Sequence, residues 1–370
     1  MAEIVLSTQK LSVGYGKKLV IGGIEISVER GKILTLIGPN GAGKSTVLKT
    51  LCRQLAPLGG TVYIGKKKLV DLSDNELARN TAVLLTGKVR TEYMQCIDVV
   101  KMGRYPYTGR LGVLSKYDNE KVEEVIKKVD IESIANSDFE SVSDGQRQRV
   151  LIAGAICREP QILILDEPAT FLDIKYKLEL MDILKKLAYE QNTAIIMSLH
   201  ELDLAQRVSD KLLCIKGNRP DRFGTPEEIF TGSYIETLYD VKKGSLCEYY
   251  GTIELHRSEG EPKVFVIGGG GSGITVYRKL RRLNIPFAAG VIHENDIEYP
   301  VAMALASKLV TEKAFEQISD ENYEKALEIM SKCESVICVA AKFGTMNKRC
   351  KELLQEAQRA GKLIEGAFDE

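Results

Sequence analysis

A glycine-rich segment near the N-terminus carries the clearest chemistry in this sequence. It follows an apolar stretch, 32–37, that is predicted to form a buried strand, and it leads into a helix predicted to begin at Lys44. Glycines let successive backbone N–H groups converge on phosphate oxygens, and the helix adds the positive end of its dipole. The expected phosphate contacts are Gly38, Asn40, Gly41, Gly43, Lys44, Ser45 and Thr46.

Two of these side chains have specific expected roles. Lys44 is expected to reach the terminal phosphates of a nucleotide, where it assists catalysis, and the Ser45 hydroxyl is expected to ligate Mg²⁺. The alternative, a chance glycine-rich turn, does not explain the full spacing or the position between a strand and a helix. The segment therefore predicts a nucleotide phosphate site.

A pair of acidic residues could supply the metal ligand and the base that nucleotide hydrolysis needs. Asp166 and Glu167 follow the apolar run 162–165, which is predicted to be a buried strand. Ligands bind at the carboxyl ends of strands in open α/β sheets. Asp166 is therefore expected to hold Mg²⁺, directly or through water, and Glu167 to polarise an attacking water. Such a pair is a weak signal alone and a strong one beside a phosphate loop.

The elements that must position these residues alternate between strand and helix, which predicts an α/β fold. A helix is expected over 174–191 and a strand over 194–199. Residues 241–262 are rich in Gly, Ser and charge and lack helical periodicity, so they predict a linker. The expected organisation is a nucleotide-binding domain, 1–240, this linker, and a second α/β domain, 263–370.

Composition limits the other possibilities. The 370 residues contain 51 basic and 51 acidic side chains, so there is no global argument for a nucleic-acid partner or an anionic membrane. No apolar run approaches the roughly 20 residues that span a bilayer, and the first residues do not resemble a signal peptide. A cytoplasmic chain is expected. None of the eight cysteines forms a Cys-x-x-Cys pair, so buried reduced thiols are expected rather than a metal site.

With these motifs in place, the first 240 residues resemble the ATP-binding subunits of ABC transporters. Ser143-Asp144-Gly145-Gln146 resembles the signature segment, usually Ser-Gly-Gly-Gln, and the segment ending at Asp173 resembles the D-loop. His200 stands at the position of the family's switch histidine, and Tyr15 matches the aromatic residue that stacks on adenine. Taken alone, His200 and Tyr15 could be an ordinary helix-start histidine and a surface tyrosine.

The resemblance implies a mechanism as well as an ABC cassette fold with antiparallel and helical subdomains. Two copies are expected to face each other, with each ATP between the phosphate loop of one copy and Ser143, Gly145 and Gln146 of the other. ATP closes this dimer and hydrolysis reopens it. His200 is expected to contact the γ-phosphate and the attacking water. One departure is Thr86, which stands where the family has a glutamine; its hydroxyl is a candidate ligand for Mg²⁺ or the water.

Three classes of function are compatible with a P-loop: a transport ATPase, a soluble ABC ATPase of DNA repair or translation, and a P-loop metabolic enzyme. The absence of a long heptad run and of a second cassette disfavours the soluble class, and the signature segment disfavours the third. The segment Met102–Gly109 resembles ATPases that serve importers of iron chelates, heme and vitamin B12. The implied partners are a membrane permease, docking near 86–110 at the cytoplasmic face, and, through it, an extracytoplasmic binding protein.

The second domain contains a further glycine-rich turn, Gly268–Gly273, after a strand predicted over 264–267. With a strand predicted over 287–292 and Glu294 near the ribose-binding position, this pattern resembles a dinucleotide-binding fold. Further strands are expected over 308–311, 335–339 and 362–364. Three interpretations of this domain are compatible with the pattern: a small-ligand or nucleotide sensor, a Rossmann-like packing or dimerisation domain, and an enzyme. The sensor goes with the alternative function, a soluble non-transport ABC ATPase regulated by this domain.

Overall fold

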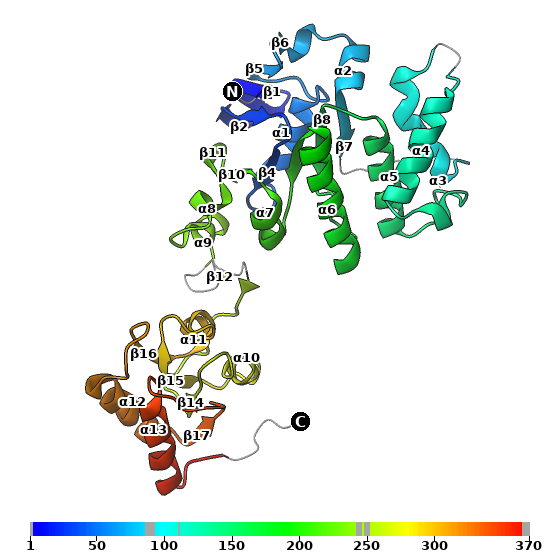
Figure 1. Cartoon of the computed structure of the whole chain (residues 1–370). Helices are drawn as coiled ribbons and strands as arrows, with labels where there is room; N and C mark the ends of the chain where they lie inside the picture. The colour runs from blue at the N-terminus through cyan, green and yellow to red at the C-terminus, as the bar shows by residue number, and fades with distance from the viewer. Residues whose placement is uncertain (1–2, 86–92, 110–111, 242–245, 248–251, 365–370) are drawn as a thin grey trace. The chain divides into compact units, whose positions relative to one another are not determined.

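The computed structural model describes residues 3–85, 93–109, 112–241, 246–247 and 252–364. Its internal contacts divide the chain into two compact units, Met1–Tyr239 and Asp240–Glu370, which are described separately (Figure 1). The α/β class expected from the sequence is confirmed in both. Among the helices within these described ranges, none is both long enough and apolar enough to cross a bilayer.

The first unit is built on a six-stranded sheet that positions the predicted site. The strand order is β11 (Arg219–Gly224), β10 (Lys211–Lys216), β4 (Ile33–Ile37), β9 (Ala194–Ser198), β8 (Ile162–Asp166) and β7 (Thr81–Leu84). Only the β10–β11 pair is antiparallel. Strands β4, β8 and β9 are buried along their whole length, as their unbroken apolar runs predict for parallel strands covered on both faces.

A second, antiparallel sheet covers the helix that follows the phosphate loop. It contains β2 (Lys18–Ile24), β1 (Ile4–Tyr15), β5 (Gly59–Ile64) and β6 (Lys67–Lys68), with β3 (Ser27–Glu29) paired to β1. Apolar side chains of β1 and β2 share one core with α1 (Lys44–Leu51) and with β4, β8 and β9. The phosphate loop therefore lies between two sheets that hold both of its ends.

The remaining helices of the first unit fall into two groups. The helices α3 (Cys96–Lys101), α4 (Lys116–Lys128) and α5 (Asp144–Cys157) gather on one side as the expected helical subdomain (Figure 1). The others accompany the sheets: α2 (Asp74–Asn80), α6 (Ile174–Gln191), α7 (Leu202–Val208), α8 (Pro226–Ile229) and α9 (Tyr234–Tyr239). Short 3-10 helices are η1 (Leu69–Asp71), η2 (Met102–Tyr107) and η3 (Glu132–Ile134).

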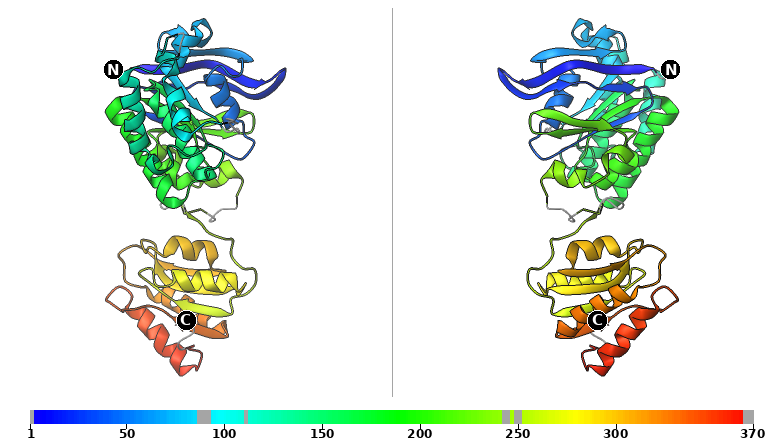
Figure 2. Two further views of the ribbon diagram at one scale, coloured as in Figure 1. Left: turned by 90° about the vertical axis from the view of Figure 1, so that its right-hand side faces the viewer. Right: turned by 90° about the vertical axis from the view of Figure 1, so that its left-hand side faces the viewer.

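The second unit has a four-stranded parallel sheet with helices on both faces (Figure 2). The strand order is β16 (Lys308–Glu312), β15 (Phe287–His293), β14 (Val264–Ile267) and β17 (Ser335–Cys338). One core joins the sheet to α10 (Ile274–Arg282) and α11 (Tyr299–Leu305), and another joins it to α12 (Asp320–Lys332) and α13 (Lys348–Arg359). The sheet therefore has the doubly wound, Rossmann-like arrangement expected for this region.

One detail of the second unit differs from the expectations. The strand predicted over 362–364 is reduced to a single bridge, between Val336 and Leu363. Three residues are too few for periodicity to carry much information. Within the predicted linker, β12 (Leu246–Cys247) pairs with β13 (Thr252–Ile253).

Candidate nucleotide-binding site

The phosphate loop connects the carboxyl end of β4 to the first turn of α1, and its glycines are required by geometry. Gly41 and Gly43 adopt left-handed backbone angles, with φ of 78° and 100°. A Cβ atom at Gly38 would lie 2.3 Å from the Ile215 carbonyl oxygen, and one at Gly43 would lie 2.6 Å from Cγ1 of Val20. Larger residues would therefore push the loop away from both sheets.

Lys44, the first residue of α1, turns its side chain back along this loop. It is 5% exposed, and its Nζ donates to the carbonyl oxygens of Gly38 at 2.7 Å and Pro39 at 3.2 Å. Burial lowers the pKa of its ammonium group, while the carboxylates of Glu167 and Asp166 act in the opposite direction. The predicted phosphate-binding lysine and the two predicted acids therefore share one electrostatic environment.

A cluster of four polar side chains forms at the carboxyl ends of β8 and β9. Asp166 is 1% exposed and accepts a hydrogen bond from the Ser198 hydroxyl, Oγ to Oδ1, at 2.7 Å. The same hydroxyl oxygen accepts the Glu167 N–H at 2.9 Å. His200 Nε2 lies 2.6 Å from Glu167 Oε1, and because a carboxylate can only accept, this nitrogen carries the hydrogen. The predicted metal ligand, base and switch histidine thus form one connected network.

Strand register explains why residues so distant in sequence meet here. Ser198 pairs with Asp166 on β8 and with Leu36 on β4, so the ends of three adjacent parallel strands lie side by side. The phosphate loop begins directly after β4. The loop and the acids consequently occupy the same edge of the sheet, as the strand–loop order of the sequence predicts.

The signature segment begins α5 with a reciprocal capping box. The Gln146 N–H donates to Ser143 Oγ at 3.3 Å, and the Ser143 N–H donates to Gln146 Oε1 at 3.0 Å. Gly145 has no room for a side chain without displacement, since a Cβ there would lie 3.1 Å from the Phe171 carbonyl oxygen. Ser143 is exposed, so this helix start faces outward from its own chain.

The other predicted contacts are more scattered. Tyr15, at the end of β1, is 49% exposed, and Asn40 is also exposed at the tip of the loop. Ser45 is half-buried and Thr46 is buried at the start of α1. Asp173 caps its own helix, α6, by accepting the Tyr176 N–H at 3.0 Å. Thr86 lies outside the described residues.

Two residues that sequence reasoning did not select make contacts with this site. One is Ser198, a fully buried residue. Its sequence signal is a polar residue at the end of an apolar strand. The other is Tyr239, the last residue of α9, whose hydroxyl accepts the Gly38 N–H at 3.1 Å. No local pattern marks Tyr239, because its partner, Gly38, lies in the phosphate loop about 200 residues earlier in the sequence.

Part of the segment that resembles the chelate importers has a structural role. Arg104, in η2, is 2% exposed and forms ion pairs with Asp118 at 2.8 Å and Glu159 at 2.9 Å. A Cβ at Gly103 would lie 2.2 Å from the Gly154 carbonyl oxygen. These contacts join η2 to α4 and α5 and leave the neighbouring Tyr105 exposed.

Comparison with known proteins gives similarities in both units of the chain. The family model described as ABC transporter matches residues 21–170, and a second model, the MJ0874 family, matches residues 287–365. A Methanocaldococcus jannaschii protein named as an uncharacterized ABC transporter ATP-binding protein is 44% identical over 277 residues, which are 75% of this chain and 96% of that one. A probable siderophore transport system ATP-binding protein of Bacillus subtilis is 37% identical, covering 65% of this chain and 88% of its own.

Further similarities extend to the second unit and to solved structures. A cobalamin import ATP-binding protein of Halobacterium salinarum is 26% identical over 91% of this chain and 86% of its own. The solved dimeric structure of MJ0796, a bacterial ABC transporter cassette, is 25% identical with a TM-score of 0.55, covering 60% of this chain and 98% of its own. The chain therefore belongs to the ATP-binding proteins of ABC transporters, which are the nucleotide-binding ATPase subunits of these systems.

Proposed function

We propose that this chain hydrolyses ATP to energise the import of an iron-chelate or cobalamin-type solute. The names of the Bacillus and Halobacterium relatives support the solute class. The observation that supports the chemistry is the network joining Asp166, Ser198, Glu167 and His200 at the edge of the sheet where the phosphate loop begins.

The phosphates of ATP would be held by the loop from Gly38 to Thr46. Successive N–H groups in left-handed turns converge on an anion, and the start of α1 adds its dipole. Lys44 would exchange its hydrogen bonds with the loop carbonyls for the terminal phosphates. Tyr15, half-exposed at the end of β1, would stack on adenine.

The donor atoms near this loop fit Mg²⁺. The Ser45 hydroxyl and the Asp166 carboxylate offer oxygen only, which suits a hard divalent cation. The Ser198 hydroxyl orients Asp166 by donating to one of its oxygens. Thr86 is kept as a further candidate oxygen ligand. When bound, Mg²⁺ would neutralise charge on the phosphates.

Glu167 and His200 would act on the attacking water. Glu167 is the proposed base, because a carboxylate beside the phosphates can accept the water's proton as the bond forms. His200 donates to Glu167 through Nε2 and so fixes the direction of that carboxylate. In the ATP-bound site, His200 would also contact the γ-phosphate.

A second copy of the chain would complete the site. Ser143, Gly145 and Gln146 start an outward-facing helix whose N–H groups suit a γ-phosphate held by the other copy. Asp173 would lie near the same interface through the D-loop. A membrane permease docking near 86–110, at the cytoplasmic face, and an extracytoplasmic binding protein would complete the importer. We also propose 241–262 as the linker between domains 1–240 and 263–370.

The test compares the full-length wild type with Glu167→Gln. Removing the base should reduce Mg-ATP hydrolysis by about 10²–10⁴-fold while ATP still binds, so mass measurement in solution should show an ATP-stabilised dimer. Glu190→Gln, on the exposed end of α6, is the matched control and should hydrolyse ATP normally. Unchanged hydrolysis in Glu167→Gln would refute the assigned base.

The solute class needs a separate test in cells. A strain that depends on this chain should lose uptake of a ferric siderophore, of cobalamin, or of both when it carries Glu167→Gln. Normal uptake of both compounds in that strain would refute the import assignment while leaving the ATPase result untouched.

A further inference from the structure

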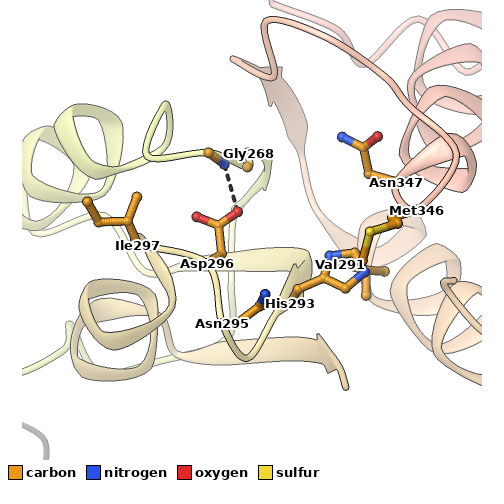
Figure 3. Close-up of a pocket in the computed structure, with 10 residues that line it drawn as sticks. Gly268, Val291, His293, Asn295, Asp296, Ile297, Met346 and Asn347 are labelled. Atoms are coloured by element: carbon orange, nitrogen blue, oxygen red, sulfur yellow. Dashed lines mark hydrogen bonds between the residues drawn. The ribbon is translucent and has the colours of Figure 1, made fainter. Parts of the chain in front are cut away.

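The second unit contains a cavity that the ATPase function does not use. Its volume is about 390 Å³, which is within the range of small-molecule sites. Its walls come from the glycine-rich loop after β14, from the end of β15 with the loop that follows, and from the residues before α13 (Figure 3). Its lining residues include Asp296, His293, Asn295, Ile297, Met346 and Val291.

The position of this cavity in the sheet points to a ligand site. In the strand order β16-β15-β14-β17, β14 is the first strand of the sheet in sequence and lies beside β17, the fourth. The chain connections therefore diverge on either side of β14. Ligands of doubly wound sheets bind beside the carboxyl ends of the strands at this point of divergence. Segments that follow β14, β15 and β17 all line the cavity.

The glycine loop, however, is closed by carboxylates of its own chain. The Gly270 N–H donates to Asp296 Oδ2 at 2.7 Å, and the Gly273 N–H donates to Glu298 Oε2 at 2.7 Å. A dashed line in Figure 3 marks the hydrogen bond that reaches Asp296 from the glycine loop. Glu298 is fully buried, and its other oxygen accepts the Tyr277 hydroxyl hydrogen at 2.9 Å. Two amide groups that a dinucleotide-binding loop offers to phosphate are therefore committed to acids.

The acid nearest the cavity is also not the one that sequence spacing suggests. Glu294, at the expected ribose-binding position, is exposed and does not line the cavity. Asp296 lines it instead, held in place because Oδ2 accepts from Gly270 and Oδ1 accepts the Glu298 N–H at 3.1 Å. Each carboxylate oxygen can accept a further hydrogen bond.

The remaining lining groups are unfavourable for binding a phosphate group. They suit a ligand that has hydroxyl donors and an apolar ring. The ten lining residues include no lysine or arginine. His293 Nε2 donates to the Glu316 carbonyl oxygen at 2.9 Å, so in the neutral ring Nδ1 is an acceptor. Val291, Ile297 and Met346 provide apolar surface for a flat ring. A phosphate placed here would meet the Asp296 carboxylate with no cation to offset it.

We propose that this cavity binds a nucleoside through its ribose hydroxyls, which donate to Asp296, and that it discriminates against the phosphorylated nucleotide. The base would lie against Ile297 and Met346. This makes the second unit a nucleoside-binding module attached to an ATPase, and the assignment does not depend on the transported solute.

Calorimetry of the full-length chain tests this, with saturating Mg-ADP present to fill the ATP site. The probes are adenosine, guanosine, cytidine and uridine, each beside its 5′-monophosphate and its 2′-deoxy form. We expect at least one nucleoside to bind once per chain, with its 5′-monophosphate about tenfold weaker or more because of like-charge repulsion. Its 2′-deoxy form should be several-fold weaker because it lacks a hydroxyl donor.

Two substitutions identify the cavity as the site. Asp296→Asn should weaken nucleoside binding about tenfold, since it removes a carboxylate acceptor. It should also reduce the ratio of nucleoside affinity to monophosphate affinity, since it removes the negative charge. Glu294→Gln, an exposed acid two residues away, is the matched control and should change neither value. Ile297→Lys, at a side chain that is 52% exposed and so tolerant of change, should improve monophosphate binding relative to the nucleoside.

The proposal would be overturned if none of the four nucleosides bound, or if the 5′-monophosphate or the 2′-deoxy form bound as tightly as the nucleoside. It would also be overturned if Asp296→Asn and Ile297→Lys both kept the wild-type preference for the nucleoside over its monophosphate. If Asp296→Asn loses its folded structure by circular dichroism, Ile297→Lys alone decides the question. None of these results bears on ATP hydrolysis, so this proposal and the ATPase assignment fail separately.

Discussion

Ser198 contacts both Asp166, the proposed metal ligand, and Glu167, the proposed base. It has no proposed contact with ATP itself. Its hydroxyl donates to Asp166 and accepts the Glu167 N–H, so one side chain sets the position of the metal ligand and of the base. We expect Ser198→Ala to lower ATP hydrolysis or Mg²⁺ affinity by about 10–100-fold, as loss of an orienting partner does elsewhere.

A Mg²⁺ titration of the hydrolysis rate separates this effect from a general loss of structure. Ser209→Ala is the matched control, because its hydroxyl donates to Thr35 Oγ1 at 2.6 Å and reaches neither acid. Equal Mg²⁺ dependence in Ser198→Ala and the wild type would show that the acids hold their positions without this serine.

Tyr239 has an equally specific contact with the phosphate loop. Its hydroxyl accepts the Gly38 N–H, and burial raises the pKa of that hydroxyl to about 12, so it stays protonated. Tyr239→Phe removes one hydrogen bond worth about 0.5–1.5 kcal/mol. We expect nucleotide affinity to fall by about threefold to tenfold.

The control for this change lies on the same helix. Tyr234→Phe removes a hydroxyl whose hydrogen bond goes to Asp221, at 2.7 Å, and not to Gly38. Fluorescent nucleotide titration of both variants should show weaker binding only in Tyr239→Phe. Equal loss in both would mean that α9 acts through general stability.

At the scale of elements, the junction between β16 and α12 depends on one buried acid. Burial acts to raise the pKa of Glu312, but hydrogen bonds from Ser319, Asn322 and the Lys313 N–H outweigh it and hold the pKa at about 2. The ordinary value is 4.5, so the folded-state pKa is depressed. Its stabilisation is therefore fully present above pH 4.5 and is lost as the pH falls towards 2.

Glu312→Gln should remove this pH dependence and lower the free energy of unfolding at neutral pH by a few kcal/mol. The chain has no tryptophan, so denaturant unfolding is best followed by circular dichroism. Glu316→Gln, at an exposed neighbouring acid, should behave as the wild type between about pH 4.5 and 2. An acid dependence as steep in Glu312→Gln as in the wild type would contradict the assignment.

How far the elements could be predicted depended on their length and periodicity. The helix expected over 174–191 has the bounds of α6, because eighteen residues give a clear repeat. The strand expected over 362–364 is only a bridge, since three residues give none. The motifs located Lys44, Asp166, Glu167 and His200, whereas Ser198 and Tyr239 became visible only through strand register and long-range packing.

At the scale of the whole molecule, each unit has its pocket or site at the carboxyl ends of parallel strands. In the first unit the glycine loop keeps its anion-binding geometry, with Lys44 beside it. In the second unit a similar loop is held by Asp296 and Glu298. The spacing of glycines predicted both loops, but it could not show that acids from the loop after β15 would occupy one of them.

The position of β4 in its sheet also has a consequence for folding during synthesis of the chain. This strand lies between β9 and β10, and Gly38, directly after it, donates to Tyr239. A chain emerging from the ribosome thus displays β4 long before its neighbours exist. Until residues 194–216 have been synthesised, both edges of this apolar strand stay unpaired. An exposed, unpaired apolar strand is prone to aggregation, so β4 is a hazard to the nascent chain until most of the first domain exists.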